Sequence, residues 1–418
     1  MINKPRGTED ILPADSILWQ KIEQAARDVC AVYGYREIRT PVFEDTSLFQ
    51  RGVGDTTDVV QKEMYTFEDK GGRSITLRPE GTASLVRSFI ENSLYADPQP
   101  TKLFYLISCY RYEKPQSGRL REFHQFGVEC FGGTSDAADA EIIALALAFF
   151  ERLGVKNLKL NLNSIGCPVC RKEYNEKLRE YFSQYKSELC QTCLSRLEKN
   201  PMRIIDCKSE ICSKIAENAP RMIDHLCEDC RQHFNKTQKY LDSMNISYTI
   251  DPHIVRGLDY YTRTVFEITS DALGAQSTVC GGGRYNGLVE ELGGKPTEGI
   301  GFAAGLERLV MIMKQQGLDQ NCTSAPPRLF LAALGEEAEV AAQQLVFALR
   351  SMGCYAERDL CGRSLKAQMK YANKLGAAFS IVLGESELKQ GAAGLKNMET
   401  GEVQDIALTA EAIYNQIK

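Results

Sequence analysis

The chain has 418 residues, of which 43% are apolar and 25% are charged, and its net charge is −5. This length predicts two or three domains with a substantial core. The acidic balance argues against an unspecific nucleic-acid coat but leaves a local basic patch open. The opening MINKPRGTED lacks the apolar segment of a secretory signal, and the longest aliphatic run, IIALALAFF, is too short to span a bilayer. We therefore expect a cytoplasmic protein without a membrane partner.

The first 310 residues predict a mixture of helices and strands. Residues 14–34 have the pattern of an amphipathic helix that leads into a strand, EIRTPVFE, in which Pro41 indicates an edge or an interface. A helix at 136–154 and an alternating strand, LKLNLNSI, follow. Residues 170–245 are helix-rich and charged, and 253–310 return to strands and glycine turns before a helix.

The last ninety residues predict a separate unit. NCTSAPPR at 321–328 has the composition of a linker. Strand RLFLAAL, helix 336–352, strand CYAERD, helix 363–375 and strand AFSIVLG then alternate, which predicts a mostly parallel sheet. The expected domains are 1–320, with a helical, cysteine-rich insertion at 167–250, and an α/β domain at 329–418.

The insertion holds eight of the fifteen cysteines, in four pairs. Without a secretory signal, we expect no disulfide framework. Three of the pairs are CxxC, the spacing of thiolate metal ligands, and Cys190/Cys193 with Cys227/Cys230 could close one tetrahedral zinc site. The alternative is a set of free, reduced thiols, because the intervening spacing is longer than in common zinc ribbons.

Polar residues interrupt apolar elements at several places. In TLRPEGTASLVRSF (76–89), Glu80 either complements the dipole of the helix that follows or accepts a substrate ammonium. In LFYLISCYRYEKPQSGRLREFHQFGVECFG (103–132), two apolar strands flank a basic loop. Arg111 and Glu113 share one face of the first strand, and Gln125 and Glu129 share one face of the second.

Such charges in apolar strands must be paired or bound to a ligand if they are buried. A solvated outer face of an antiparallel sheet is the alternative. The basic loop between the strands favours a ligand, because it could embrace a phosphate backbone.

Two further segments combine glycines with arginines. VCGGGRYNGL (279–288) permits close backbone approach to a ligand, but neither a dinucleotide fingerprint nor a phosphate-binding P-loop motif is present. GIGFAAGLERLVMIM (299–313) runs from a strand into a helix whose first turn carries Arg308, which could meet a phosphate or simply lie at the surface.

In this order, the segments resemble the class II aminoacyl-tRNA synthetases and, within them, the histidyl-tRNA synthetase family. The resemblance covers nearly the whole chain: PRGTEDILP, EIRTPVFE, LRPEGT, RYEKPQSGRLREFHQFGVE, RGLDYYTRTVFE, GGGRYNG, GIGFAAGLERL and the tail unit. It implies an α+β fold with an antiparallel sheet flanked by helices, a C-terminal anticodon-binding domain, and a homodimer built partly through the segment around Pro41.

The resemblance also implies roles for individual residues. Arg111 would hold the α-phosphate of ATP, Glu113 would sit near the adenine, and Arg308 would bind the γ-phosphate end, with Mg²⁺ sharing the charge. Arg256 would contact the reacting carboxylate and the α-phosphate. The histidine substrate would meet three groups of residues: Glu80, Thr82 and Gln125 at its ammonium, Glu129 and Tyr261 at its imidazole, and Tyr260 and Tyr285 as walls.

The implied reaction forms histidyl-adenylate from histidine and ATP and then transfers histidine to the 3′ end of tRNA(His). Lys114 and Gln116 would lie near the acceptor stem. Arg363, Lys366, Lys370 and Lys374 are spaced to form one basic helical face, which fits either RNA binding or simple solvation.

Two other functions compete with this interpretation. A non-catalytic synthetase paralogue that regulates histidine biosynthesis would be expected to lack the tail domain and to degrade RGLDYY, and both are intact here. A zinc-dependent nucleic-acid-binding module rests on the cysteines alone.

Overall fold

The computed structural model describes residues 1–54, 57–207, 209–276, 278–320 and 322–418. The chain divides into two compact units, Met1–Cys322 and Thr323–Lys418. Residue 321, the first of the expected linker, lies outside the described residues. Within the described part of the chain, no helix has both the length and the apolar character needed to cross a membrane.

The first unit is built on an eight-stranded sheet with the order β1-β5-β6-β11-β10-β9-β7-β8. The strands are β1 (Arg36–Glu37), β5 (Thr101–Tyr110), β6 (Glu122–Phe131), β7 (Leu158–Ser164), β8 (Thr249–Ile250), β9 (Thr262–Ser270), β10 (Thr278–Arg284) and β11 (Gly299–Gly305). The six inner strands pair antiparallel, whereas the outer pairs β1–β5 and β7–β8 are parallel. This architecture confirms the predicted fold class.

Side chains that alternate along the strands build a different core on each face of the sheet. Phe126 and Val128 of β6 join the core formed with α1 (Pro13–Tyr33), α4 (Asp136–Arg152) and α10 (Leu306–Gln315). Tyr105 and Ile107 of β5 join the core on the other face, with α3 (Thr82–Glu91) and the insertion. Gln125 and Glu129 alternate with Phe126 and Val128 along β6. Their side chains therefore point to this second face.

The predicted strand EIRTPVFE is two strands in two different sheets. Arg36–Glu37 forms β1, and Phe43–Asp45 forms β2 of a small sheet with the order β2-β4-β3, which also contains β3 (Tyr65–Glu68) and β4 (Ser74–Leu77). Pro41 lies in the break, where it offers no N–H to a ladder. The carbonyls of Thr40 and Pro41 accept hydrogen bonds from Arg78 Nη1 instead, at 2.8 and 3.1 Å.

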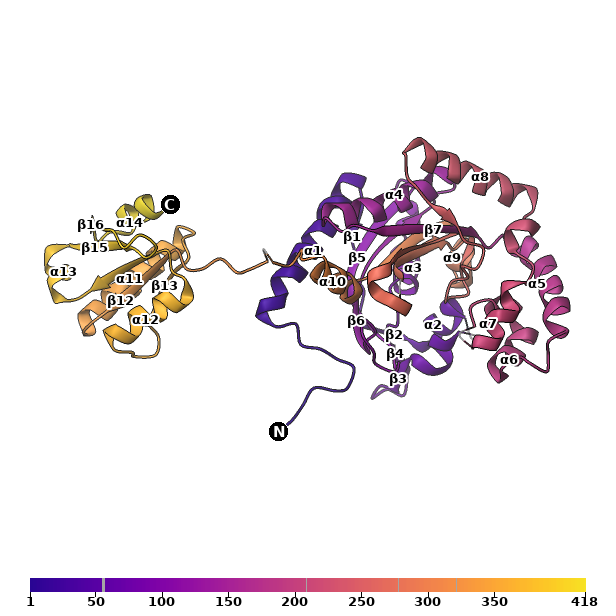
Figure 1. The fold of residues 1–418 in the computed structure, drawn as a ribbon, viewed down its shortest axis with the longest axis horizontal. Helices are drawn as coiled ribbons and strands as arrows, with labels where there is room; N and C mark the ends of the chain where they lie inside the picture. Colours follow the sequence, from indigo (N-terminus) through magenta and orange to yellow (C-terminus); the bar gives the residue numbers. More distant parts are fainter. Residues whose placement is uncertain (55–56, 208, 277, 321) are drawn as a thin grey trace. The chain divides into compact units, whose positions relative to one another are not determined.

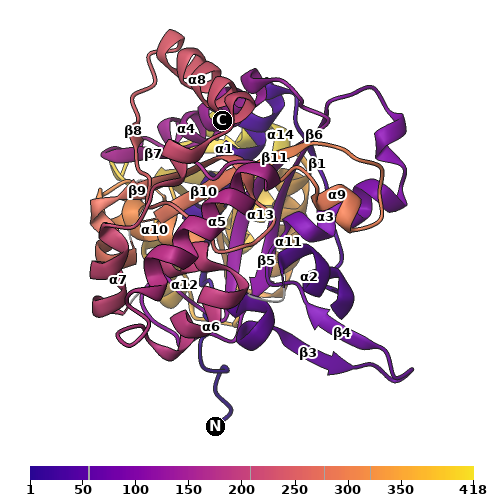
Figure 2. The same cartoon turned by 90° about the vertical axis from the view of Figure 1, so that its right-hand side faces the viewer.

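The insertion between β7 and β9 is helical, as predicted. It contains α5 (Pro168–Ser183), α6 (Gln191–Lys199), η3 (Pro201–Ile204), α7 (Glu210–Glu217), η4 (Met222–His225) and α8 (Glu228–Ser243). Helix α8 runs beside α4 (Figure 1), and Figure 2 views the molecule from the side on which α5, α6 and α7 lie.

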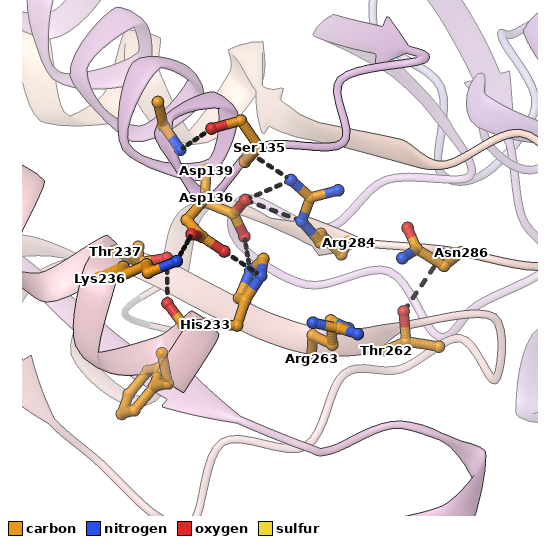
Figure 3. A network of polar contacts seen from close by, with 12 residues as sticks. Ser135, Asp136, Asp139, His233, Lys236, Thr237, Thr262, Arg263, Arg284 and Asn286 are labelled. Atoms are coloured by element: carbon orange, nitrogen blue, oxygen red, sulfur yellow. Dashed lines mark hydrogen bonds and ion pairs between the residues drawn. The ribbon is translucent and has the colours of Figure 1, made fainter. Parts of the chain in front are cut away.

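A buried polar network fastens α8 to α4 and the sheet (Figure 3). Asp139 of α4 accepts hydrogen bonds from Arg284 Nε at 2.7 Å and from His233 Nε2 of α8 at 3.1 Å when that nitrogen carries a proton. Arg284 also pairs with Glu298 at 2.8 Å and is fully buried. Arg284 therefore contributes to the scaffold.

The second unit contains a five-stranded sheet with the order β13-β12-β14-β15-β16. Its elements are β12 (Leu329–Ala333), α11 (Glu336–Ser351), β13 (Ala356–Arg358), α12 (Leu365–Leu375), β14 (Phe379–Leu383), α13 (Glu385–Gln390), β15 (Ala392–Asn397), β16 (Val403–Ala407) and α14 (Ala410–Ile417). Strands β13, β12 and β14 are parallel, but β15 and β16 add an antiparallel hairpin at one edge. The expectation of a mostly parallel sheet is wrong for this edge, because two strands joined by a tight turn pair antiparallel.

Candidate functional site

A cavity of about 910 Å³ opens on the second face of the large sheet. The segments that line it include the start of α3, the loop after β5, residues 256–261 before β9, and the start of α10, together with positions of β6, β10 and β11. Residues of the insertion, Arg196 and Arg203 among them, complete the wall. Nearly all the residues predicted as the site of the first unit therefore line one cavity, with widely separated parts of the chain contributing.

Glu129 is the centre of a buried hydrogen-bonded cluster in this cavity. Its Oε1 accepts a bond from Thr82 Oγ1 at 2.7 Å, and its Oε2 accepts one from Tyr285 Oη at 2.6 Å. Tyr105 Oη lies 3.5 Å from Oε1. Burial raises the pKa of Glu129 to about 8, although these hydrogen bonds oppose the shift. The carboxyl group therefore changes charge near neutral pH.

Glu80 caps helix α3. Its two carboxylate oxygens accept the backbone N–H groups of Thr82 and Ala83, each at 2.8 Å. Burial raises the pKa of Glu80. Glu80 therefore stabilises the N-terminus of α3, which is one of the two roles expected for it. Its other expected role, binding a substrate ammonium, stays a prediction.

Three tyrosines form one wall of the cavity next to Glu129. The ring centroids of Tyr260 and Tyr261 are 4.7 Å apart, and those of Tyr260 and Tyr285 are 5.8 Å apart with the rings edge to face. Tyr260 Oη lies 3.5 Å from Glu80 Oε2. All three side chains are buried, so this wall is apolar with hydroxyl groups at defined points.

Arg256 forms an ion pair with Glu267 of β9 inside the cavity wall. Thr278 Oγ1 donates to the other oxygen of Glu267 at 2.8 Å, and the guanidinium lies 5.6 Å from the ring centroid of Tyr261. The charge of Glu267 raises the pKa of Arg256 against the effect of burial. A Cβ at Gly281 would lie 2.4 Å from Arg256 Nη2, so this glycine leaves room for the guanidinium.

Glu267 was not predicted from the sequence. The signal existed, because Glu267 shares its strand face with Val265, which packs in the core on the cavity side. Within the glycine run 281–283, Gly281 lines the cavity, whereas Gly282 lies against the neighbouring strand: a Cβ there would lie 2.3 Å from the carbonyl oxygen of Gly301.

A second group in the cavity consists of arginines. Arg111 Nε donates to the carbonyl of Pro79 at 2.8 Å, and Arg308 donates to the carbonyls of Gly118 and Thr278 at 3.1 and 2.6 Å. Burial lowers the pKa of Arg308, and the charges of Arg119 and Arg111 lower it further. These cations therefore repel one another, and an anionic ligand would relieve the repulsion.

The structure corrects the placement of Arg111 and Glu113. Strand β5 ends at Tyr110, so both residues lie in the loop after the strand rather than on its face. Glu113 is nevertheless buried, and it pairs with Arg119 across the loop. Lys114 and Gln116 of the same loop line the cavity, and Lys114 is exposed there.

Gln125 also lines the cavity, and its Oε1 lies 3.3 Å from the thiol of Cys109. Next to it on β6, His124 contacts Glu307, with 2.8 Å between Nδ1 and Oε1. This pair was not predicted, because the two residues are far apart in the chain and meet only through the packing of α10 on β6.

The predicted basic face of the second unit is narrower than expected. Lys366, Lys370 and Lys374 lie along α12, and all three are exposed. Arg363 precedes the helix, pairs with Asp359, and lies 4.3 Å from the ring centroid of Tyr371. Its guanidinium is therefore already engaged within the unit.

Eight cysteines of the insertion form two separate clusters. The Cys167 cluster contains Cys167, Cys170, Cys227 and Cys230, and the Cys190 cluster contains Cys190, Cys193, Cys207 and Cys212. The expected site made from Cys190, Cys193, Cys227 and Cys230 is wrong in its pairing. The pair at the start of α6 lies with Cys207 and Cys212, whereas the pair at the start of α8 lies with Cys167 and Cys170 at the start of α5.

Comparisons with known proteins agree with this geometry. A family model described as histidyl-tRNA synthetase matches residues 7–309, and one described as anticodon binding domain matches residues 328–413. Two proteins named histidine–tRNA ligase are similar: that of Acetivibrio thermocellus is 60% identical over 97% of each chain, and that of Clostridium perfringens is 54% identical over the whole of both. The crystal structure of apo S. aureus histidyl-tRNA synthetase is 42% identical, covers both chains fully and superposes with a TM-score of 0.85.

Proposed function

The chain belongs to the histidyl-tRNA synthetase family, and we propose that it activates histidine with ATP and transfers it to the 3′ end of tRNA(His). One observation carries the proposal: a buried carboxyl–tyrosine cluster and a group of mutually repelling arginines line the same cavity. The first suits an amino acid, and the second suits a polyphosphate. Their junction is where a carboxylate and a phosphorus atom would meet.

The histidine substrate would bind against the carboxyl–tyrosine cluster. Glu80, Thr82 and Gln125 would hold its ammonium, and Glu129 with Tyr261 would reach its imidazole, between the walls formed by Tyr260 and Tyr285. The imidazole of neutral histidine offers one N–H donor and one acceptor. A buried carboxyl that titrates near neutral pH can match that donor. An amino acid without this pattern would lack the hydrogen bond to the buried carboxyl of Glu129, and a site built on such contacts can discriminate by roughly 10⁴–10⁵.

ATP would bind at the arginines. Arg111 would hold the α-phosphate, Arg308 the γ-phosphate end, and Glu113 would lie near the adenine. The mutual repulsion of Arg111, Arg119 and Arg308 supports this assignment, because bound phosphates would reverse it. Glu307, next to Arg308, lines the same cavity, and a carboxylate is the kind of hard oxygen ligand that Mg²⁺ takes together with phosphates. When bound, Mg²⁺ would neutralise charge on the transferred phosphates.

In the first step, a carboxylate oxygen of histidine attacks the α-phosphorus and pyrophosphate leaves. Negative charge grows on the phosphoryl oxygens, and a preorganised cation aimed at them stabilises the transition state. Arg256 is suited to this role because Glu267 and Gly281 hold its guanidinium in place before the substrates arrive. In the second step, a ribose hydroxyl of the 3′-terminal adenosine attacks the activated carbonyl, and AMP leaves.

The tRNA would contact both units. Lys114 and Gln116 lie beside the cavity, where the acceptor end must enter. Residues 329–418 would act as the anticodon-binding domain, with Lys366 and Lys370 on α12 meeting phosphates and Arg363 contributing only the part of its guanidinium not held by Asp359.

We also propose that the protein works as a homodimer in the cytoplasm. Val42 and Phe43, next to Pro41, are exposed, as is Phe67 of β3 at the other edge of the same small sheet. An apolar patch of this kind on the small sheet supports a subunit interface there. Sedimentation of the purified protein tests it, and a monomer at micromolar concentration would contradict the dimer.

Histidine-dependent exchange between pyrophosphate and ATP tests the activation step directly. The synthetase should incorporate labelled pyrophosphate into ATP only when histidine and Mg²⁺ are present. A non-catalytic paralogue would bind histidine without exchange, and a nucleic-acid-binding module would do neither. Absence of exchange with protein that binds both substrates would overturn the proposal.

A further inference from the structure

We propose that each cysteine cluster of the insertion binds one structural zinc ion, and that the two ions hold the insertion against the backbone of residues 256–261. The Cys167 cluster joins the starts of α5 and α8, and the Cys190 cluster joins the start of α6 to α7. This inference goes beyond the proposed synthetase reaction, which requires neither ion.

The sulfur atoms have the spacing of a tetrahedral zinc site. Four thiolates at ~2.3 Å from one zinc ion lie ~3.8 Å from one another. Cys167 Sγ lies 3.7 Å from Cys170 Sγ and 4.0 Å from Cys227 Sγ. In the other cluster, Cys190 Sγ lies 3.9 Å from Cys207 Sγ. All four sulfurs of each cluster lie within 4.8 Å of one another.

The surrounding backbone favours thiolates over thiols. The N–H of Cys227 points to Cys170 Sγ at 3.1 Å, the N–H of Cys190 points to Cys212 Sγ at 3.3 Å, and the N–H of Ser209 points to Cys207 Sγ at 3.5 Å. Cys167, Cys190 and Cys227 are also the N-cap residues of α5, α6 and α8. Backbone N–H groups and helix N-termini stabilise negative charge. They therefore favour the thiolate form of cysteine, which is the form that binds zinc.

Other fates of eight clustered cysteines fit less well. All the cysteines of the described residues are free, at sulfur separations far beyond the ~2.05 Å of a disulfide. The thiolates of a [4Fe–4S] cluster bind four different iron atoms and so lie further apart than ligands of a single ion. Two buried and two partly exposed thiols per cluster match a closed site at the edge of a small core.

The insertion forms hydrogen bonds to residues 256–261, the catalytic segment, from positions close in sequence to both clusters. Arg203, in the short helix η3 that follows α6, donates to the carbonyls of Arg256 and Gly257 at 2.8 and 3.2 Å. Asn200 donates to Asp259 Oδ1 at 3.2 Å. Arg171, the residue after Cys170, donates to the carbonyl of Tyr261.

These contacts make Arg203 a positioning residue, because it holds the backbone of Arg256 and need not touch a substrate to do so. Arg171 directly follows the ligand candidate Cys170 in α5, and Arg203 lies in η3 directly after α6, whose only buried residues are Cys193 and Leu197. Metal ligation would therefore fix the elements whose contacts fix Arg256. Asp259, which accepts the hydrogen bond from Asn200, belongs to this junction.

Metal content of the full-length protein tests the two sites. Protein purified without chelator should contain about one zinc per cluster, and replacement by Co²⁺ should give the intense sulfur-to-cobalt absorption of a tetrathiolate site. Cys193→Ser and Cys230→Ser should each remove one ion, whereas Cys361→Ser, an exposed cysteine of the second unit, should remove none. Wild-type protein that retains no metal and shows no thiolate absorption with Co²⁺ would overturn the sites, even if the serine variants fail to fold.

Hydrogen exchange tests the link to the catalytic segment. Amides in peptides covering 255–262 should exchange faster after zinc is removed or in Cys193→Ser, and stay unchanged in Cys361→Ser. Arg203→Ala should also speed exchange there and lower kcat of pyrophosphate exchange more than it raises KM for histidine. Arg203→Lys, which keeps one donor, should recover part of the loss. Unchanged exchange in metal-free protein would show that the ions do not position Arg256.

Discussion

The cavity face of the large sheet and the helical insertion hold polar groups in different ways. On the sheet, Glu129 is fixed by the ladder: Leu103 and Gly301 are its neighbours across the two adjacent strands. A Cβ at Gly301 would lie 1.9 Å from Glu129 Oε2, so the small neighbour is what admits the carboxyl. In the insertion, side chains rather than a ladder connect the helices, through thiols, the Asp139 network and arginine contacts with carbonyls.

This difference predicts that substitutions in the two regions impair different properties of the protein. Changes on the sheet face should alter substrate binding or chemistry while the fold survives, because the backbone position does not depend on the side chain. Changes in the insertion should first reduce stability and loosen the segment before β9. Substitutions in each region can therefore separate the two behaviours.

Asp139→Asn should give the largest loss of stability. The variant removes the fully buried counter-ion of Arg284 and a partner of His233, and breaking a buried pair costs about 3–5 kcal/mol. Denaturant unfolding measures the effect. Glu298→Gln, which changes the partly exposed partner of the same guanidinium, is the control and should cost at most about 1 kcal/mol. Equal losses in the two variants would contradict the dominant role of the buried pair.

The same carboxyl gives a pH dependence. Burial alone would raise the pKa of Asp139, but the hydrogen bond from His233 and the charge of Arg284 lower it overall. Because the folded pKa lies below the unfolded one, the stabilisation is present above the unfolded pKa and is lost as pH falls through the folded pKa. Asp139→Asn should therefore lose less stability than the wild type when the pH is lowered from neutral to acid.

Arg256→His should lower kcat of pyrophosphate exchange by about 10²–10³, the cost of one preorganised charge-stabilising group, and leave histidine affinity largely unchanged. Equilibrium binding of histidine beside exchange kinetics measures the split. The variant also leaves Glu267 without its cation, so Arg256→His combined with Glu267→Gln should regain stability without activity. Equal losses of binding and rate would count against a charge-stabilising role.

Glu129→Gln should raise KM for histidine by about 10–10²-fold, the effect of one lost hydrogen bond to a charged group, with little change in KM for ATP. In the wild type, KM for histidine should fall as the pH rises through about 8, where Glu129 loses its proton and can accept the imidazole N–H. The variant should lack this dependence. Glu122→Gln, on the same strand but outside the cavity lining, should behave as the wild type. The same pH profile in both variants would remove Glu129 from imidazole recognition.

The smallest expected effect lies outside both regions. Lys366→Ala with Lys370→Ala should weaken tRNA binding by a few-fold at low salt and reduce the salt slope by about 0.7–0.9 for each phosphate that the protein no longer neutralises. Pyrophosphate exchange, which needs no tRNA, should stay unchanged. Lys389→Ala on α13, whose lysine pairs with Glu385, is the control. Unaltered salt dependence in the double variant would show that the basic face of α12 is simply solvated.

Local pattern was sufficient for most regular elements and for part of the site, whereas the resemblance to the family supplied the other predicted site residues. Period-two alternation placed Gln125 and Glu129 on one face of β6, and helical spacing predicted α1 and α4 to within a few residues. The pattern was misleading at Pro41, where the predicted single strand is two short strands that belong to different sheets. It failed again at Arg111, because nothing in the sequence marks the end of β5 at Tyr110.

Partners distant in the chain were beyond such patterns. The ion pair of Glu267 with Arg256 is apparent only in the tertiary structure. The grouping of the cysteines likewise depends on which helix N-termini lie close together. The three CxxC pairs and the one Cys-x4-Cys pair can each be recognised in the sequence. Spacing alone, however, would allow any two of these four pairs to form a site.

The sequence by itself determined the family and the order of the elements, because motifs and periodicity are local properties of a chain, and the resemblance to the family supplied the site residues that line the cavity. Tertiary structure alone decided how these groups are paired: Glu129 with Thr82 and Tyr285, and Arg256 with Glu267. It also decided that the eight cysteines form two clusters rather than one. The physical reason is that pKa values, ion pairs and metal geometry depend on distances of a few ångströms between residues that the chain itself keeps far apart.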